Sequence, residues 1–520
     1  MNPMIDTALA RLPDYLGQHV LLSVSAIAIG LIISLPLAIA VSRVTWLRGP
    51  ALAAASVVQT IPGLALLALF YPLLLALSVF TRHVFGFGFR ALGFLPALLA
   101  LTLYSMLPIL RNTVTALASI DPAILTAARG VGMTARQSLL LVELPLAAPI
   151  VMAGLRTASV WVIGTATLST PVGQTSLGNY IFTGLQTENW IFVLFGCVAA
   201  ALLALIIDRL LSLAEDGFAL RSRGRLIAAV AGLALVIGAS LAPLFASVEH
   251  PIVVGTKSFD EQYILGALIE DRLHKAGFAT QRRDGLGSTV IFHALEAGDV
   301  DVYVDYSGTL WTTAMHRADM PGRKPVLDQL SAWLAKRGSR SLGSLGFENA
   351  YAIAMRRDRA KQLGIETLAD LAAYAPRMKI GGDYEIFSRP EWAAVTKTYG
   401  LHFGTQRQYQ ANFMYSAVAS GDVDAITAFS SDGRIAQYDL KLIADPKQAL
   451  PPYDAVLLVS PRHAGDDRLI AALKPLIGAL DLSTMQQANL MVDRADDKRT
   501  PEQAAAWLDA RAKVGERVGQ

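Results

Sequence analysis

Side chains able to bind a small solute recur in the second half of the chain, each time where a β-rich run gives way to a helix. Three such junctions are Gly287-Ser-Thr289, Ser307-Gly-Thr309 and Ser430-Ser-Asp-Gly-Arg434. The first turn of a helix leaves backbone N–H groups free to donate to a ligand. Because strand ends and helix starts meet at one edge of an open α/β sheet, we expect these groups to converge on a single crevice.

The residue combinations that support catalysis are missing from the sequence. The eight histidines are scattered, with no His-Glu-x-x-His spacing, and Cys197 is the single cysteine. The phosphate-binding pattern Gly-x-x-x-x-Gly-Lys-Ser/Thr does not occur. The sequence therefore predicts a binding protein rather than an enzyme, with no metal, cofactor or ATP site of its own.

The first half of the chain has the composition of a segment dissolved in lipid. Residues 1–247 hold eight of the 42 acidic residues, and the first lysine is Lys257. Counting apolar stretches of about 20 residues predicts six transmembrane helices, at 17–41, 50–79, 91–118, 144–170, 190–213 and 225–247. The opening residues lack the features of a cleavable signal peptide, so we expect the first span to remain as an anchor.

Arginine residues orient these spans. They follow the first, third and fifth spans, as Arg43 and Arg48, Arg129 and Arg136, and Arg209 with Arg221, Arg223 and Arg225. The positive-inside rule places those loops in the cytoplasm. We therefore expect the N-terminus outside and residues 248–520 on the periplasmic or external side of a bacterial cytoplasmic membrane.

Two features of the membrane half stand out from its apolar background. The long cytoplasmic loop holds Thr126-Ala-Ala-Arg-Gly-Val-Gly132, and Pro122 and Gly132 bracket a predicted short helix there. Gln59-Thr-Ile-Pro-Gly63 should break the second span, because Pro62 removes a backbone donor. The break either lines a translocation path or is a packing kink.

The second half alternates β-rich runs with amphipathic helices, which is typical of α/β lobes. Ile252–Gly255, Asp301–Tyr306, Lys379–Tyr384 and Ala425–Phe429 read as strands. We expect a helix that starts at a capping box formed by Ser258 and Glu261, and a second that runs from Gly287 to Gly298.

The predicted fold is an all-α membrane domain of about six spans fused to an α/β domain of two hinged lobes. We place the transmembrane domain at 1–224, the last span and linker at 225–250, and the soluble domain at 251–520. Lobe I should comprise about 251–355 and 455–520, and lobe II about 356–454, with crossings near Ala352-Ile353 and Val456-Leu457. A cleft between hinged lobes traps a small solute.

The cytoplasmic loop resembles the coupling loop of ABC importer permeases, which reads Glu-Ala-Ala, three residues, Gly, nine residues, then Ile-x-Leu-Pro. The chain matches this pattern at Ala127, Ala128, Gly132, Val142, Leu144 and Pro145. Thr126 stands where the glutamate is usual. The resemblance implies that Thr126, Ala127, Ala128 and Gly132 dock a separate cytoplasmic ABC ATPase, and that the chain works as a homodimer.

The soluble half resembles the substrate-binding proteins of the osmoprotectant uptake family for glycine betaine, choline and carnitine. The motifs that carry the resemblance are Gly255-Thr-Lys-Ser-Phe-Asp-Glu-Gln262, Leu286-Gly-Ser-Thr289, Tyr303-Val-Asp-Tyr-Ser-Gly-Thr309, Glu348-Asn-Ala-Tyr351 and Ser430-Ser-Asp-Gly-Arg-Ile435. Some of these receptors are fused to their permease, and relatives of the fused type import ergothioneine. The resemblance implies uptake of a small quaternary-ammonium solute and no nucleic-acid partner.

A quaternary ammonium offers no hydrogen-bond donor, so its binding needs aromatic faces. Tyr306 and Tyr351 fall on the family motifs, and Tyr384, Phe387 and Phe429 lie at comparable turns of the second lobe. A solute carboxylate would need donors such as Gln262, Thr289, Ser430, Ser431 or Arg434, although Arg434 could instead pair with Asp432. The remaining site candidates are Ser288, Thr309, Asp383, Asp432 and Asp305, and Asp305 could face a cation or act as a structural cap.

Departures from the family leave the identity of the solute open. Ser258 and Asp260 stand where Asn and Thr are frequent, and His293 where a glutamate is common. An importer of ergothioneine or another trimethylammonium zwitterion is one alternative. A membrane-anchored solute sensor is another, but it would have one or two spans and a signalling domain.

Overall fold

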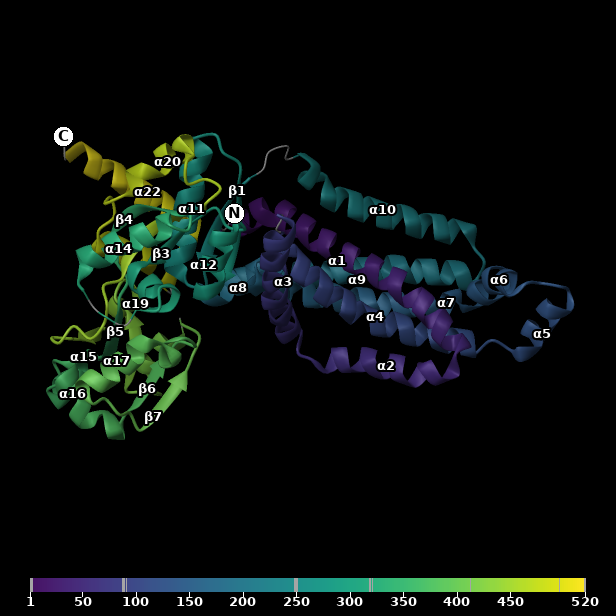
Figure 1. Cartoon of the computed structure of the whole chain (residues 1–520), viewed down its shortest axis with the longest axis horizontal. Coiled ribbons are helices and arrows are strands. Elements are labelled where there is room, and N and C mark those ends of the chain that lie inside the picture. Colours follow the sequence, from purple (N-terminus) through teal and green to yellow (C-terminus); the bar gives the residue numbers. More distant parts are fainter. Residues whose placement is uncertain are drawn as a thin grey trace. The chain divides into compact units, whose positions relative to one another are not determined.

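The computed structural model describes residues 3–86, 89, 91–246, 251–317, 319, 321–411, 413–494 and 496–518. The chain forms two compact units, the first built from Ala8–Phe182 and Ile191–Val248, the second from Met1–Thr7, Thr183–Trp190 and Glu249–Gln520. We call the first unit the membrane domain, and residues 251–518 of the second the binding domain (Figure 1). Residues 247–250 of the expected linker lie outside the described residues.

The regular elements described in the first half of the chain are all helices. Its elements are α1 (Pro3–Arg43), α2 (Thr45–Thr60), α3 (Gly63–Phe85), α4 (Phe94–Ala118), α5 (Pro122–Gly130), α6 (Ala135–Ser138), η1 (Leu139–Glu143), α7 (Leu144–Ala166), η2 (Thr167–Val172), α8 (Gly178–Gln186), α9 (Trp190–Ala219) and α10 (Arg223–Ala246). Six helices of the described part are long and apolar enough to cross a membrane. They confirm the predicted number of spans.

The predicted second span is wrong in its bounds, because 50–79 covers parts of two helices. The chain leaves helical geometry at Ile61, so α2 ends at Thr60 and the crossing helix is α3. Pro62 has no N–H with which to continue the helix. The carbonyl freed at Ile61 accepts a hydrogen bond from the Tyr104 hydroxyl of α4, which satisfies it inside the protein.

The binding domain is built on two five-stranded sheets. The first has the order β2 (Thr280–Leu286), β1 (Ile252–Lys257), β3 (Val302–Tyr306), β10 (Asp454–Val459), β4 (Arg340–Glu348). The second has the order β7 (Thr405–Gln408), β6 (Lys379–Gly382), β8 (Ala425–Phe429), β5 (Tyr351–Arg356), β9 (Leu440–Ile443). In each sheet four strands run in one direction and one runs against them, β10 in the first sheet and β5 in the second.

Helices cover both sheets. In chain order they are α11 (Asp260–Lys275), α12 (Ser288–Ala297), α13 (Ser307–Thr309), η3 (Leu310–Ala314), α14 (Arg323–Ala335), α15 (Arg357–Leu363), α16 (Leu368–Tyr374), η4 (Ala375–Arg377), η5 (Ile386–Ser388), α17 (Pro390–Tyr399), α18 (Phe413–Ser420), α19 (Arg434–Gln437), α20 (Asp467–Leu473), η6 (Lys474–Leu476), α21 (Leu482–Asp493) and α22 (Pro501–Val518). Every residue of β1 is buried, as expected for a central parallel strand covered on both faces.

The crossings between the lobes fall outside the strands rather than within them. β4 belongs to the first sheet and β5 to the second, so the first crossing lies at Asn349-Ala350, before the expected boundary at 355. The return crossing lies between β9 and β10, ahead of Val456. Asn349 N–H bonds to the carbonyl oxygen of Tyr453 at 3.0 Å and ties the two crossings together.

The predicted capping box at the start of α11 is also wrong. Phe259 occupies the N-cap position, without a side-chain cap. Ser258 is exposed, and Glu261 turns its carboxylate into the protein instead of toward the helix end. By contrast, α12 begins after Gly287 and ends at Gly298, which adopts the left-handed conformation at φ +74°, as predicted.

Candidate functional site

Aromatic rings from both lobes meet where the strand ends face one another. Phe259 follows β1 and Tyr306 ends β3, while Tyr351 starts β5, Phe429 ends β8 and Tyr453 precedes β10. Phe259 stacks on Phe429 with centroids 5.8 Å apart and lies 6.1 Å from Tyr306. Tyr351 lies 5.1 Å from Phe429 and 5.7 Å from Tyr453. We call these five rings the aromatic cluster.

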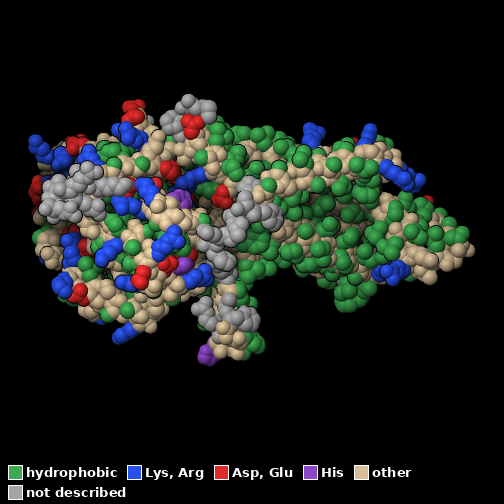
Figure 2. All heavy atoms as spheres, turned by 90° about the horizontal axis from the view of Figure 1, so that it is seen from above, with side chains coloured by type: hydrophobic (Ala, Val, Ile, Leu, Met, Phe, Trp, Pro, Cys, Tyr) green, Lys and Arg blue, Asp and Glu red, His purple; other side chains and the backbone are tan. Residues whose placement is uncertain are grey.

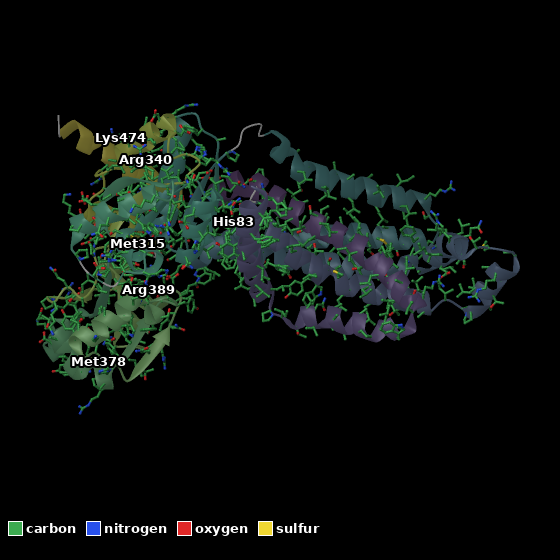
Figure 3. The ribbon with its side chains drawn as sticks, viewed as in Figure 1. His83, Met315, Arg340, Met378, Arg389 and Lys474 are labelled. Atoms are coloured by element: carbon green, nitrogen blue, oxygen red, sulfur yellow. The ribbon has the colours of Figure 1, made fainter. Side chains whose placement is uncertain are left out.

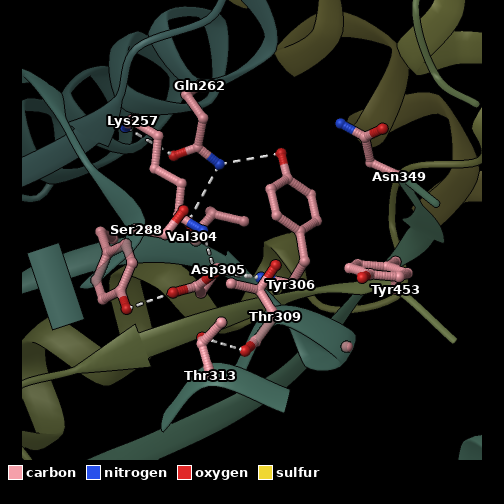
Figure 4. Close-up of polar contacts among 12 residues, drawn as sticks. Lys257, Gln262, Ser288, Val304, Asp305, Tyr306, Thr309, Thr313, Asn349 and Tyr453 are labelled. Carbon is pink, nitrogen blue, oxygen red and sulfur yellow. Dashed lines mark hydrogen bonds and ion pairs between the residues drawn. The ribbon is translucent and has the colours of Figure 1, made fainter. Parts of the chain in front are cut away.

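Hydrogen bonds behind Tyr306 fix its ring (Figure 4). Its hydroxyl donates to Glu261 Oε1 at 2.5 Å and accepts from Gln262 Nε2 at 3.0 Å. Glu261 is buried and also accepts from Asn349 and Asn489, each at 3.1 Å. Burial raises the pKa of the Glu261 carboxyl, and burial together with Glu261 raises the pKa of the Tyr306 hydroxyl. The ring is therefore positioned through its hydroxyl, while Phe259 stacks on it with centroids 6.1 Å apart.

Asp305 acts as a structural cap in this structure. One carboxylate oxygen accepts from the Tyr306 backbone N–H at 2.7 Å and the other from the Tyr303 hydroxyl at 2.6 Å. The Lys257 ammonium pairs with the same carboxylate and lies 5.3 Å from the Tyr306 ring centroid. Both charges of the pair are buried.

On the side of the second lobe, Arg389, which is labelled in Figure 3, lies against the aromatic cluster. Its guanidinium is 5.4 Å from the Tyr351 ring centroid and 3.4 Å from the Thr309 hydroxyl of lobe I. It pairs with Glu391 at 2.8 Å and with the half-exposed Glu385 at 3.1 Å. Arg389 is therefore a buried cation that touches both lobes.

Glu391 holds the lobes together beneath Arg389. Its Oε1 accepts from the Tyr453 hydroxyl at 2.6 Å and from the Thr312 hydroxyl of lobe I at 2.8 Å. Burial by itself would raise the pKa of Glu391, but the charge of Arg389 outweighs it and holds the pKa below its ordinary value. The pair is therefore fully ionised at neutral pH.

A cavity of about 290 Å³ opens in lobe I beside this cluster. Four predicted site residues line it, namely Ser288, Thr289, Asp305 and Thr309. Its far wall holds Phe292 and Trp333, whose rings stack 5.5 Å apart. Ser288 Oγ also reaches Glu385 of lobe II at 3.2 Å, so the cavity borders the cleft between the lobes.

The structure thus brings two groups of the predicted residues together. Gln262, Tyr306, Tyr351 and Phe429 belong to the aromatic cluster or support it. The other group, at the cavity, comprises Ser288, Thr289, Asp305 and Thr309.

Other predicted residues have different surroundings. Tyr384 is 66% exposed, and Phe387 packs on Trp392 with centroids 5.1 Å apart. Asp383 accepts from the Tyr351 hydroxyl at 3.0 Å and from two backbone N–H groups of the following turn. Ser430 Oγ accepts from the Ala350 N–H at 2.9 Å and so ties the crossing between lobes. These contacts give Asp383 and Ser430 supporting positions.

Arg434 is enclosed by carboxylates rather than free for a solute. It pairs with Asp432 at 2.7 Å, with Asp260 at 3.5 Å and with Asp493 at 3.7 Å. Its guanidinium also lies 4.5 Å from the Tyr415 ring centroid. Of the two roles that the sequence left open for Arg434, this geometry favours the ion pair with Asp432.

Sequence reasoning missed several residues of the cleft. Phe259 and Lys257 lie inside the motif Gly255–Gln262 and could have been found there. Arg389 precedes Pro390 at the start of α17, which resembles the other helix starts that we considered. Tyr453 and Asn349 belong to the crossing segments, and no local pattern marks them.

The predicted coupling loop forms a separate short helix, α5. Asp121 caps it by accepting from the Ala123 N–H at 2.8 Å, and Gly132 turns the chain at φ +82° just beyond its end. Thr126 bonds back to the Pro122 carbonyl oxygen at 2.9 Å. Ala127 is exposed, whereas Ala128 is buried within the chain. Exposed apolar side chains, Ile124 and Val131, flank the helix face and suit a protein contact.

Comparisons with known proteins agree with this arrangement. Residues 26–219 match the binding-protein-dependent transport system inner membrane component, and residues 250–510 match the substrate binding domain of the ABC-type glycine betaine transport system. The chain therefore belongs to the family of ABC importers in which one polypeptide carries the permease and the substrate-binding domain. It is a multi-pass membrane protein, and a permease of this kind implies a separate ATPase and a small solute.

Among its relatives is the ergothioneine transport permease/ergothioneine binding protein EgtU of Helicobacter pylori (strain G27). The two chains are 30% identical over 457 residues, 84% of this chain and 78% of that protein. The glycine betaine/carnitine/choline transport system permease protein OpuCB of Bacillus subtilis (strain 168) is 39% identical over 38% of this chain and 84% of its own. The glycine-betaine-binding protein of Pseudomonas aeruginosa PAO1 is 30% identical over 49% of this chain and 85% of its own.

Proposed function

We propose that this importer subunit takes up a small solute with a quaternary ammonium group, of the glycine betaine, choline or carnitine kind. The observation that carries the proposal is the aromatic cluster, in which rings from both lobes meet at the strand ends. A quaternary nitrogen has no N–H to donate in a hydrogen bond, so the cation is bound by aromatic faces. A desolvated aromatic face contributes about 0.5–2 kcal/mol to its binding. The rings contact one another here, so the lobes must part to admit the solute and close on it afterwards.

Arg389 is the cation that we assign to a solute carboxylate. It lies beside Tyr351, within reach of the Thr309 hydroxyl, and one of its two carboxylate partners, Glu385, is half exposed. A bound carboxylate can replace Glu385 without leaving a buried charge unpaired, because Glu391 remains. Arg434 lacks this freedom, since its carboxylate partners are all buried.

Calorimetric titration of the full chain in lipid nanodiscs tests this proposal. Glycine betaine, choline and carnitine are compared with glycine, which has the carboxylate of glycine betaine but no methyl groups on nitrogen. We expect binding of at least one quaternary solute and none of glycine. Equal binding of glycine and glycine betaine would show that the aromatic cluster does not select the cation.

Ergothioneine is a second candidate, favoured by two observations. The relative that spans 84% of this chain carries ergothioneine in its name, and the cavity of about 290 Å³ beside the cluster offers space for a ring attached to the trimethylammonium end. In the same titration, Trp333→Ala should weaken ergothioneine binding and leave glycine betaine binding unchanged. If both solutes lose affinity equally, the cavity does not receive the ring.

We further infer that two copies of the chain form the pore, with one ATPase docked on each α5, and that the binding domain lies on the outer side. One helical coupling loop per chain supports this stoichiometry. The arginines that follow α1, α4 and α9 support the orientation. A protease added to intact spheroplasts should therefore cleave within 251–518 and spare the loop around α5.

A further inference from the structure

A groove of about 910 Å³ opens in the membrane domain between five helical elements. Leu31 of α1, Leu141 of η1, Leu155 of α7 and Leu226 of α10 line its walls, together with the end of α9. Every side chain that lines it is apolar except that of Arg221. The volume of the groove is far greater than that of a packing defect, and one cation lies at its edge.

Arg221 is held at this edge by an unusual backbone conformation. It lies just past α9 at φ +51°, where glycine is the common residue. The turn is closed by hydrogen bonds from Ser222 N–H to the Gly217 carbonyl oxygen at 2.9 Å and from Arg221 N–H to that of Phe218 at 3.3 Å. A side chain in this conformation crowds the following carbonyl oxygen, so the turn that carries Arg221 is held against backbone strain.

The positive charge of Arg221 has no carboxylate partner among the described residues. The acidic residues nearest in the chain are already engaged, since Asp216 faces Arg225 at 3.9 Å. Asp208 and Glu215 both pair with Arg156, at 3.0 and 2.7 Å. In Figure 2 the surface of the membrane domain is largely hydrophobic, with separate groups of Lys and Arg side chains. Arg221 is exposed, so its guanidinium is accessible to an anion from outside the chain.

The wall formed by η1 is unusual too. Residues Leu139–Glu143 form a π-helix, a geometry that is frequent at functional sites. The side chains of Leu140 and Leu141 point outward and are 49% and 65% exposed. Behind them Glu143 is anchored by Arg43 at 2.6 Å and by the Ser138 hydroxyl at 3.1 Å. The exposed leucines are therefore set in place by buried polar contacts and need an apolar partner.

We propose that this groove binds an anionic phospholipid, with its acyl chains along the leucines and its phosphate on Arg221. Guanidinium groups bind phosphate oxygens in a two-pronged geometry, and basic pockets between membrane helices are suited to anionic headgroups. A second copy of the chain fits less well. A symmetric contact would bury two Arg221 side chains, while the nearby carboxylates already have partners.

Lipid retention by the purified full chain tests this proposal. The protein is equilibrated in micelles with equal amounts of phosphatidylglycerol and phosphatidylcholine, and the bound lipid is counted by native mass spectrometry. The wild type should retain phosphatidylglycerol preferentially. Arg221→Gln should reduce that retention about fivefold. The matched control, Arg223→Gln, removes the same charge from a position outside the groove and should change nothing.

A second variant, Ala148→Trp, fills the groove itself and should displace both lipids. Monodispersity and assembly with the ATPase check the fold of each variant. If Arg221→Gln and Arg223→Gln lose the same amount of bound phosphatidylglycerol, the preference comes from general surface charge and the proposal is overturned. Phosphatidylglycerol that survives Ala148→Trp would place the lipid elsewhere. A disulfide between two copies carrying Leu141→Cys and Cys197→Ser would show that a second copy covers the groove.

Discussion

At the scale of single residues, Tyr306 combines two roles that a substitution series can separate. Its ring contributes to the aromatic cluster, and its hydroxyl donates to the buried Glu261. Tyr306→Ala should lower affinity for a quaternary solute about tenfold or more. Tyr306→Phe keeps the ring, so it should spare affinity and lower the stability of the binding domain by about 1 kcal/mol. Calorimetry and thermal melting measure the two effects.

Equal affinity losses for the two Tyr306 variants would mean that the hydroxyl binds the solute directly. Tyr351 provides the parallel case, because its hydroxyl donates to Asp383 and its ring faces Arg389. The same pair of substitutions at Tyr351 should follow the same pattern.

Arg389 should discriminate between solutes by their carboxylates. Arg389→Ala is expected to weaken glycine betaine or carnitine binding about tenfold or more, since a hydrogen bond to a charged group contributes about 1.5–3 kcal/mol. Choline lacks a carboxylate and should be affected much less. The ratio of the two dissociation constants in one variant cancels any general loss of folding. An unchanged ratio would remove Arg389 from the carboxylate site.

The sequence could identify three rings of the aromatic cluster, but it pointed to Arg434 and missed Arg389. Tyr306, Tyr351 and Phe429 end or begin strands, so a strand pattern is enough to place them at the cleft. Arg434 and Arg389 both lie at helix starts. Asp260 and Asp493, which enclose Arg434, come from helices far away in the sequence. Only the tertiary fold shows which guanidinium is already paired.

At the scale of elements, the start of α11, the end of α21 and the turn after β8 meet in a buried carboxylate cluster. Burial raises the pKa of both Asp260 and Asp493, which are hydrogen-bonded to each other beside Asp432, Arg434 and Lys498. A raised pKa means that the folded state holds a proton that the unfolded state releases. This contribution to stability is present at low pH and is lost as pH rises from about 3.8 through the raised pKa.

Asp493→Asn should therefore remove one pH-dependent contribution to the stability of the binding domain. We expect a higher melting temperature than wild type at neutral pH and a smaller difference toward pH 4. Differential scanning calorimetry of both proteins across this range measures the difference, in which the contributions of the other carboxylates cancel. A gap between the proteins that does not change with pH would show that the pair is ionised in the folded state.

The α5 helix gives a prediction about coupling. Ala127→Arg introduces a long charged side chain on its exposed face and should abolish uptake, while solute binding by the full chain stays unchanged. Ala135→Arg is the matched control, because Ala135 is also exposed and lies in the next short helix. Transport into proteoliposomes and calorimetric binding provide the two measurements. Wild-type uptake by Ala127→Arg would show that α5 does not dock the ATPase.

Element boundaries were predictable where the chain itself supplies the signal. Gly287 and Gly298 delimit α12 as expected. Each of these glycines ends the helix by its own non-helical backbone conformation, which requires no contact with distant residues. The break predicted at Pro62 is confirmed, but the bounds of the second span were misplaced because they followed the apolar composition, which continues across the break. The capping box failed for a tertiary reason: Tyr306, Asn349 and Asn489 hold the Glu261 carboxylate instead.

At the scale of the whole molecule, the stoichiometry of the importer is open to a direct measurement. Six spans and one coupling helix per chain should assemble as two copies with two ATPase subunits. Mass photometry of the purified complex is expected to give a mass for this chain of twice 55.7 kDa, together with the ATPase. A complex with a single copy would contradict the homodimer.

The covalent join between the domains changes the kinetics of solute delivery. The last membrane helix ends at Ala246 and the first strand begins at Ile252, so the intervening residues reach at most roughly 20 Å. A receptor on so short a tether is present at an effective concentration in the millimolar range. Docking is thus a first-order event that does not depend on how much receptor the cell makes. Each transporter carries its own receptor in a fixed ratio. The supply of receptor therefore does not limit uptake, and the uptake capacity follows the number of transporters.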